Sequence, residues 1–175
     1  SIQLLQMVRD MRDEGKFLCG DPIKGENPRF FIGAAANPFA DPFDFRPIRL
    51  AKKVKAGADF IQTQIVFNVP KFKEYMKRAG DLGLLDKVYI LAGVSPIKSL
   101  GAARYMATQV PGMDVPEEYI ERMKAAVAGI PKEEKARRRE AWAEEGIKIC
   151  AEIIQQVREM PGVAGVHIMA IEWEE

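Results

Sequence analysis

The stretch Gly57-Ala-Asp-Phe-Ile-Gln-Thr-Gln-Ile-Val-Phe-Asn68 decides how this chain folds. A helical pattern ends at Gly57, and the β-branched and aromatic residues that follow predict a buried strand over residues 60–67. Gln62 and Gln64 have the same parity in this run, and side chains alternate across a strand, so both amides are expected on one face. Two such amides either satisfy each other in a core or line a polar cavity. The residues alone leave both interpretations open.

Length and composition indicate one soluble globular domain. The chain has 175 residues, of which 47% are hydrophobic and 29% charged, which is enough for a sizeable core. Its 26 basic and 25 acidic residues give a net charge of +1, without the basic excess of a nucleic-acid-binding protein. No apolar run approaches the ~18 residues of a membrane span, and residues 1–6 do not resemble a signal peptide. We therefore expect neither a nucleic-acid partner nor a membrane span.

Cysteine and histidine usage argues against a metal site. Cys19 and Cys150 match no metal-binding or redox spacing, and a reducing cytoplasmic compartment is the simplest interpretation. His167 is the sole histidine, so neither a histidine-rich metal site nor a histidine-based triad is expected. We expect His167, in the middle of a strand, to be a satisfied core or lumen residue.

The chain alternates between helical and strand patterns. Helices are predicted over residues 1–14, 47–56, 70–80, 100–110, from 116 onward and over 132–160, and strands over 30–36, 60–67, 87–94 and 163–171. Ser1 is a candidate cap for the first helix, and Gly146 is a candidate kink in the last. This alternation predicts an α/β protein with a parallel sheet, either doubly wound or part of a (β/α) barrel. Four strands would form half of an eight-stranded barrel, with exposed strand edges.

Five segments, in order along the chain, carry a family resemblance. They are Phe31-Ile-Gly-Ala-Ala-Ala-Asn-Pro38, Leu50-Ala-Lys-Lys-Val-Lys-Ala-Gly-Ala-Asp-Phe60, Thr63-Gln-Ile-Val-Phe67, Gly93-Val-Ser-Pro96 and Val166-His-Ile-Met-Ala-Ile171. Together they resemble methylenetetrahydrofolate reductase, a flavin-dependent (β/α)8 TIM barrel. The resemblance covers nearly the whole chain and about the last four strands of that barrel with their helices. Residues 1–175 are thus expected to form a single domain, the C-terminal half of such a barrel, most like the reductases of acetogenic and related anaerobic bacteria.

The resemblance implies a substrate site for a folate. The family transfers a hydride from reduced flavin to 5,10-methylenetetrahydrofolate and produces 5-methyltetrahydrofolate. Gln64 matches the glutamine that holds the pterin of the folate, and an amide can donate to and accept from the pterin edge at once. Tyr105 and Met106 fall near the aromatic residue that packs on the aminobenzoate ring, and Ile171 matches an apolar residue of the same pocket. Gln62 has no such match and is expected to fill the lumen.

The resemblance also implies a flavin site, for FAD or FMN. Lys53 matches a lysine on the phosphate side of the flavin. Asn37 and Asp41 lie where the loop after the family's fifth strand touches the flavin, although the family often has tyrosine and histidine there. Glu172, at the exit of the last strand, is either functional or simply solvent-facing.

No catalytic residue is assigned, because the family's catalytic carboxylates and most of its flavin contacts lie on the first four strands. We therefore expect a reductase fragment that supplies the pterin-binding glutamine and part of the flavin rim. One alternative is a non-catalytic partner subunit, whose open barrel edges a second copy or another protein would cover. Another is a pterin-dependent or corrinoid-linked methyltransferase barrel, which would transfer a methyl group without flavin. The electron donor stays open.

Overall fold

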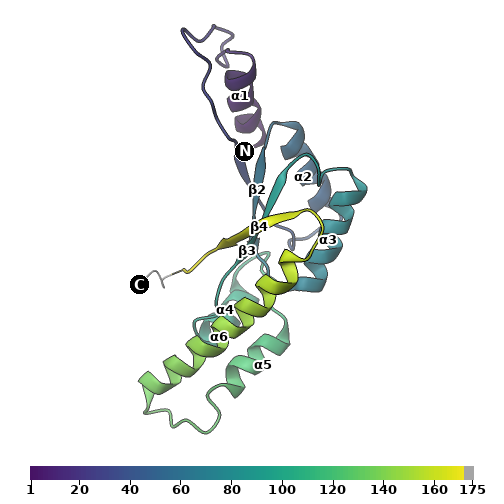
Figure 1. The fold of residues 1–175 in the computed structure, drawn as a ribbon. Coiled ribbons are helices and arrows are strands. Elements are labelled where there is room, and N and C mark those ends of the chain that lie inside the picture. The colour runs from purple at the N-terminus through teal and green to yellow at the C-terminus, as the bar shows by residue number, and fades with distance from the viewer. Residues whose placement is uncertain (172–175) are drawn as a thin grey trace.

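Four parallel strands form the centre of the molecule (Figure 1). The computed structural model describes residues 1–171, so Glu172 lies outside the described residues. The strands are β1 (Gly33–Ala36), β2 (Phe60–Ile65), β3 (Tyr89–Val94) and β4 (Val163–Ile168). Their order in the sheet is β1-β2-β3-β4, and each pairs in parallel with the next. Strand order that follows chain order is typical of a barrel, whereas a doubly wound sheet reverses direction.

Helices connect the strands and precede the sheet. They are α1 (Ile2–Asp13), α2 (Phe45–Lys55), α3 (Val69–Asp81), α4 (Leu100–Gln109), α5 (Glu117–Ala125) and α6 (Lys135–Arg158). Asn68 and Ser99 cap α3 and α4 by accepting hydrogen bonds from backbone amides at 2.9 and 3.1 Å. Ser1 occupies the N-cap position of α1, as predicted, and its carbonyl accepts from the amide of Leu5 at 2.9 Å, but its side chain makes no capping hydrogen bond. The other predicted helices and strands are confirmed, with ends that differ by a few residues.

The two faces of the sheet have different surroundings. Along β2, Ile61, Thr63 and Ile65 are buried beneath the helices, whereas Phe60, Gln62 and Gln64 are only half-buried. The predicted sharing of one face by the two glutamines is confirmed. The helices thus cover one face and leave the other, which carries both amides, more open.

Aromatic residues lie at the amino end of the open face. Phe31 stacks on Phe60 with ring centroids 5.3 Å apart, and its centroid lies 6.2 Å from that of Tyr89. Phe31 is 65% exposed and Tyr89 is 62% exposed. This aromatic cluster of Phe31, Phe60 and Tyr89 is a large apolar surface without a cover in the described part of the chain.

The crossover from β3 to β4 contains three helices, and α5 packs beside α6 where both project away from the sheet (Figure 1). Trp142 Nε1 donates to the carbonyl of Met123 at 2.8 Å and so joins the two helices. Helix α6 continues through Gly146, where a kink was considered. A Cβ at this position would lie 2.0 Å from the carbonyl oxygen of Ile97. The glycine therefore serves the close approach of α6 to the segment after β3.

Candidate functional site

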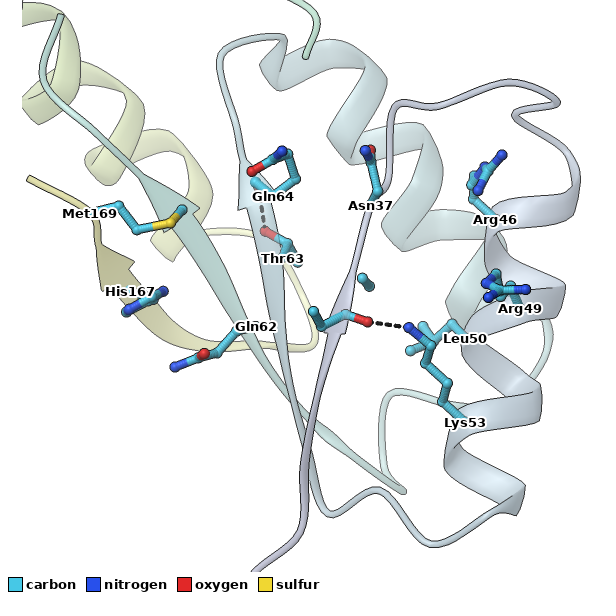
Figure 2. Close-up of a pocket in the computed structure, with 12 residues that line it drawn as sticks. Asn37, Arg46, Arg49, Leu50, Lys53, Gln62, Thr63, Gln64, His167 and Met169 are labelled. Carbon is cyan, nitrogen blue, oxygen red and sulfur yellow. Dashed lines mark hydrogen bonds between the residues drawn. The ribbon is translucent and has the colours of Figure 1, made fainter. Parts of the chain in front are cut away.

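A pocket of about 440 Å³ opens at the carboxyl ends of the strands (Figure 2). It extends from α2 across the end of β1 to β2 and β4. Its lining comprises Ala35, Ala36, Asn37, Arg46, Arg49, Leu50, Lys53, Gln62, Thr63, Gln64, His167 and Met169. The carboxyl end of parallel strands is where α/β proteins bind their ligands. Of the two interpretations of the glutamines, the polar cavity is therefore the one the structure supports.

Gln64 presents its amide to this pocket. Its Oε1 accepts a hydrogen bond from the backbone amide of Ile65 at 3.2 Å. Its Nε2 donors have no partner among residues 1–171. An amide with free donors and a second acceptor lone pair can recognise a ligand edge that carries both donors and acceptors.

Thr63 fixes the backbone beside Gln64. Its hydroxyl accepts from the amide of Gly93 at 2.9 Å and donates to the carbonyl of Gln64 at 2.8 Å. The register between β2 and β3 shifts between Gln62 and Ile65, so the regular ladder is interrupted at this point. The Thr63 hydroxyl thus satisfies a buried β3 amide where the ladder does not.

Gln62 lies one step earlier on the same face. Its side chain also lines the pocket and makes no hydrogen bond within the described residues. Gln62 therefore does more than fill the lumen, because its side-chain amide is also available to a ligand.

Helix α2 supplies positive charge to the other side of the pocket. Lys53 is buried, and its Nζ donates to the carbonyl of Ala35 (Figure 2). Burial lowers the pKa of Lys53, and the nearby charge of Arg49 lowers it further. Arg46 donates to the carbonyl of Ala40 at 2.6 Å and to that of Asp41, and so holds the loop before α2. The guanidinium of Arg49 makes no hydrogen bond or ion pair in the described part of the chain, which leaves it free for an anion.

His167 lines the pocket from β4 (Figure 2). Its Nδ1 is buried and has no hydrogen-bond partner among residues 1–171. The prediction of a lumen position is confirmed, but the prediction of a satisfied histidine was wrong. The lumen face of β3 offers no side-chain partner beside it, because the residue paired with His167 is Gly93.

Carboxylates are absent from the lining of this pocket as far as residues 1–171 define it. Nor does that part of the chain contain a group of three or more histidine, cysteine, aspartate or glutamate residues that could hold a metal ion. No helix within it is both long and apolar enough to cross a membrane.

Comparison with known proteins places the chain in a family. The family model described as methylenetetrahydrofolate reductase matches residues 7–175. The chain belongs to the methylenetetrahydrofolate reductase family. Among curated proteins, methylenetetrahydrofolate reductase 2 of Schizosaccharomyces pombe is 33% identical over 111 residues. This match covers 55% of the chain but only 17% of the yeast protein.

A solved structure shows the same fold. It is an uncharacterized protein from Clostridium thermocellum that binds two copies of 5-methyl-5,6,7,8-tetrahydrofolic acid. The TM-score is 0.57 at 15% sequence identity, over 83% of this chain and 49% of the clostridial chain. The chain thus spans about half of that structure, and its four strands in chain order form part of a (β/α)8 barrel. The predicted family and fold class are confirmed.

The residues to which the reductase resemblance gave cofactor roles lie in different places. Lys53 and Asn37 both line the pocket. Asn37 also shapes the loop after β1, because its Oδ1 accepts from the amides of Phe39 and Ala40 at 3.0 and 3.2 Å. Asp41 is exposed and lies outside the pocket lining.

The remaining predicted substrate residues are not brought together with Gln64. Tyr105, on α4, is 61% exposed, whereas Met106 on the same helix packs against the core. Ile171 is exposed beyond the end of β4. The lining of the pocket includes none of these three.

Arg46 and Arg49 were not predicted from the sequence to belong to the site. The signal that could have identified them is their spacing. Residues 46, 49 and 53 recur at helical intervals and therefore share one face of α2. Five basic residues in α2 are evident from the sequence, but only the structure shows that Arg46, Arg49 and Lys53 line the pocket.

Proposed function

We propose that this chain binds a reduced folate in the pocket and takes part in the flavin-dependent reduction of 5,10-methylenetetrahydrofolate to 5-methyltetrahydrofolate. The observation that carries the proposal is the amide of Gln64. It lies at the carboxyl end of β2, lines the pocket and keeps its donors free. A pterin edge alternates hydrogen-bond donors and acceptors, and an amide is the side chain that complements such a pair.

The α2 side of the same pocket suits the phosphate of a flavin nucleotide. Arg49 is free to pair with an anion, and Lys53 adds a second positive charge beside it. Ala35 and Ala36 form a wall of small side chains, which leaves room for a flat ring system. A bound reduced flavin, as FAD or FMN, would supply the hydride for the folate. The residues present therefore fit such a group.

The acid of the reaction is proposed to come from elsewhere. The pocket lining contains amides, cations and one imidazole, but no carboxylate within residues 1–171. A positioned general acid contributes roughly 10²- to 10⁴-fold to a rate. We therefore propose that residues 1–175 act as the C-terminal half of a barrel whose other half supplies the carboxylate and further flavin contacts.

The open face of the sheet supports the proposal that a second half completes the barrel. Phe31 and Tyr89 leave more than half of their surfaces exposed, and the outer edges of β1 and β4 have no strand partner in the described residues. Apolar surface and free strand edges of this kind are normally covered. We propose that a second copy or another polypeptide covers them. A clean monomer at high concentration in analytical ultracentrifugation would argue against this part of the proposal.

The test is to purify the chain and titrate it separately with 5-methyltetrahydrofolate and with FMN or FAD, by calorimetry and visible absorption. Saturable folate binding by folded protein supports the proposal. Folate binding without any flavin binding would support the folate site but contradict the proposed flavin site beside α2, which is the outcome that a methyltransferase would give. Tight stoichiometric flavin together with reductase activity of the chain alone would refute the proposed need for a second half. Folded protein that binds no reduced folate would refute the function itself.

A further inference from the structure

The imidazole of His167 has an unusual hydrogen-bonding state. Its Nδ1 is buried and has no partner among the described residues, although the ring lines the pocket. Buried polar atoms almost always have a partner, so an unpaired one at a ligand pocket needs an explanation. The second ring nitrogen, Nε2, is the one left to meet a ligand.

The unpaired Nδ1 determines which form of the ring is least costly. A neutral imidazole carries one N–H and one acceptor nitrogen. A proton on Nδ1 would be a buried hydrogen-bond donor without an acceptor. Burying the unpaired lone pair of an unprotonated Nδ1 costs less free energy. The neutral form with its proton on Nε2 therefore fits the surroundings best, and it makes His167 a hydrogen-bond donor towards the pocket.

The neighbouring strand β3 has a glycine beside this donor. Gly93 is paired with Ile65 on one side and with His167 on the other. A Cβ at Gly93 would lie 2.5 Å from the carbonyl oxygen of Thr63 and 2.7 Å from Cε of Met169, so the Met169 methyl group occupies the place that a side chain on β3 would take. Gln64 on β2 and His167 on β4 thus line one pocket from either side of this glycine, together with Met169, and a single ligand in that pocket is placed to meet both (Figure 2).

We propose that His167 is a pterin-positioning residue that acts as a neutral donor, with Nε2–H bonded to an acceptor atom of the bound pterin. The inference rests on the proposed folate function and adds a second anchor to it. Gln64 alone leaves the pterin free to pivot about one amide. A donor on β4, across the glycine of β3, fixes the orientation of the ring.

The sole histidine makes a direct test possible. In the wild-type chain labelled with ¹⁵N, two-bond ¹H–¹⁵N correlations report the tautomer of one imidazole without overlap. They should be recorded at about pH 8, above the usual titration range of histidine. We expect the Nε2–H tautomer in the free protein, and a shift of Nε2 when 5-methyltetrahydrofolate is added. An Nδ1–H tautomer, or no change at Nε2 on saturation, overturns the proposal.

Two variants separate donation from packing. H167F keeps a ring without a donor, and H167Q places an amide near the position of Nε2. H167F should weaken the affinity for 5-methyltetrahydrofolate about tenfold, and H167Q should stay within about threefold of the wild type. If H167F binds as tightly as the wild type while Q64A loses binding, this inference fails and the proposed function stands. If the folded wild type binds no 5-methyltetrahydrofolate, the proposed function fails and this inference fails with it. Should H167F not fold, the wild-type spectra alone decide.

Discussion

The hydroxyl of Thr63 on β2 accepts a hydrogen bond from the backbone amide of Gly93 on β3 at 2.9 Å, in a buried position. The same hydroxyl donates to the carbonyl of Gln64 at 2.8 Å. The contact lies where the register between the two strands shifts. One side chain therefore holds together the part of the sheet from which Gln64 reaches the pocket.

Replacing Thr63 by valine should destabilise the chain by about 1–3 kcal/mol, because the substitution leaves the buried amide of Gly93 without an acceptor. Urea unfolding followed by circular dichroism measures this change. Thr63→Ser is the matched control, since it keeps the hydroxyl and should lose much less. Equal losses in both variants would mean that the methyl group, not the hydrogen bond, matters here.

Replacing Gln64 by alanine should weaken binding of 5-methyltetrahydrofolate about tenfold or more, because the pterin loses both an acceptor and a donor. Gln62→Ala removes an amide from the same face of β2 and should have a smaller effect. Isothermal calorimetry on the two variants and the wild type makes the comparison. A larger loss of affinity in Gln62→Ala than in Gln64→Ala would mean that Gln62, not Gln64, makes the main contact with the pterin.

The titration of Lys53 predicts how stability depends on pH. Its pKa is lowered from the ordinary 10.5 by burial and then by Arg49. Between the lowered pKa and 10.5, the unfolded chain binds a proton that the folded chain does not, so this lysine makes stability rise with pH. The free energy of unfolding of the wild type, relative to Lys53→Met, should therefore increase from about pH 7 to about pH 10.

Urea unfolding at the two pH values measures that difference. Lys52→Met, at an exposed position of the same helix, controls for the loss of one helix charge. A wild-type advantage over Lys53→Met that falls as the pH rises would contradict the sign of the shift.

The close approach at Gly146 can be tested with a pair of glycines. A Cβ at 146 would lie 2.0 Å from the backbone carbonyl oxygen of Ile97, whereas a Cβ at Gly101 would meet nothing closer than Ser99 Oγ at 3.7 Å. Gly146→Ala should cost about 1–3 kcal/mol, because backbone must move. Gly101→Ala should stay within about 1 kcal/mol of the wild type, since alanine favours the helix. Thermal unfolding of both variants measures these changes in stability. A Gly146→Ala variant as stable as the wild type would mean that α6 can move away from Ile97 at little cost.

The order of the elements could be predicted from the sequence because local patterns specify it. The apolar run of β2 and the period of α3 are visible without any partner. Strand ends are less well determined, because pairing with a neighbour sets them. The run predicted over 30–36 is a strand only over Gly33–Ala36, where it pairs with residues 60–63 of β2.

The site could be predicted only where one residue carries the signal. Gln64 is a polar residue in a buried strand, and that contrast is local. The contribution of Arg49 depends on the orientation of α2 against β1, which no local pattern encodes. The unpaired state of His167 depends on a glycine in another strand, 74 positions earlier in the chain. Such relationships between distant residues become visible only in the folded structure.

The central claim is that Gln64 recognises the pterin of a reduced folate, and a crystal structure of the chain with 5-methyltetrahydrofolate tests it most directly. The measurement is the distance between the Gln64 amide and the nearest polar atoms of the pterin. We predict two hydrogen bonds of about 2.7–3.2 Å, one that the amide nitrogen donates to the pterin and one that the amide oxygen accepts from it. A folate bound elsewhere, or a pterin in the pocket without contact to Gln64, would contradict the claim.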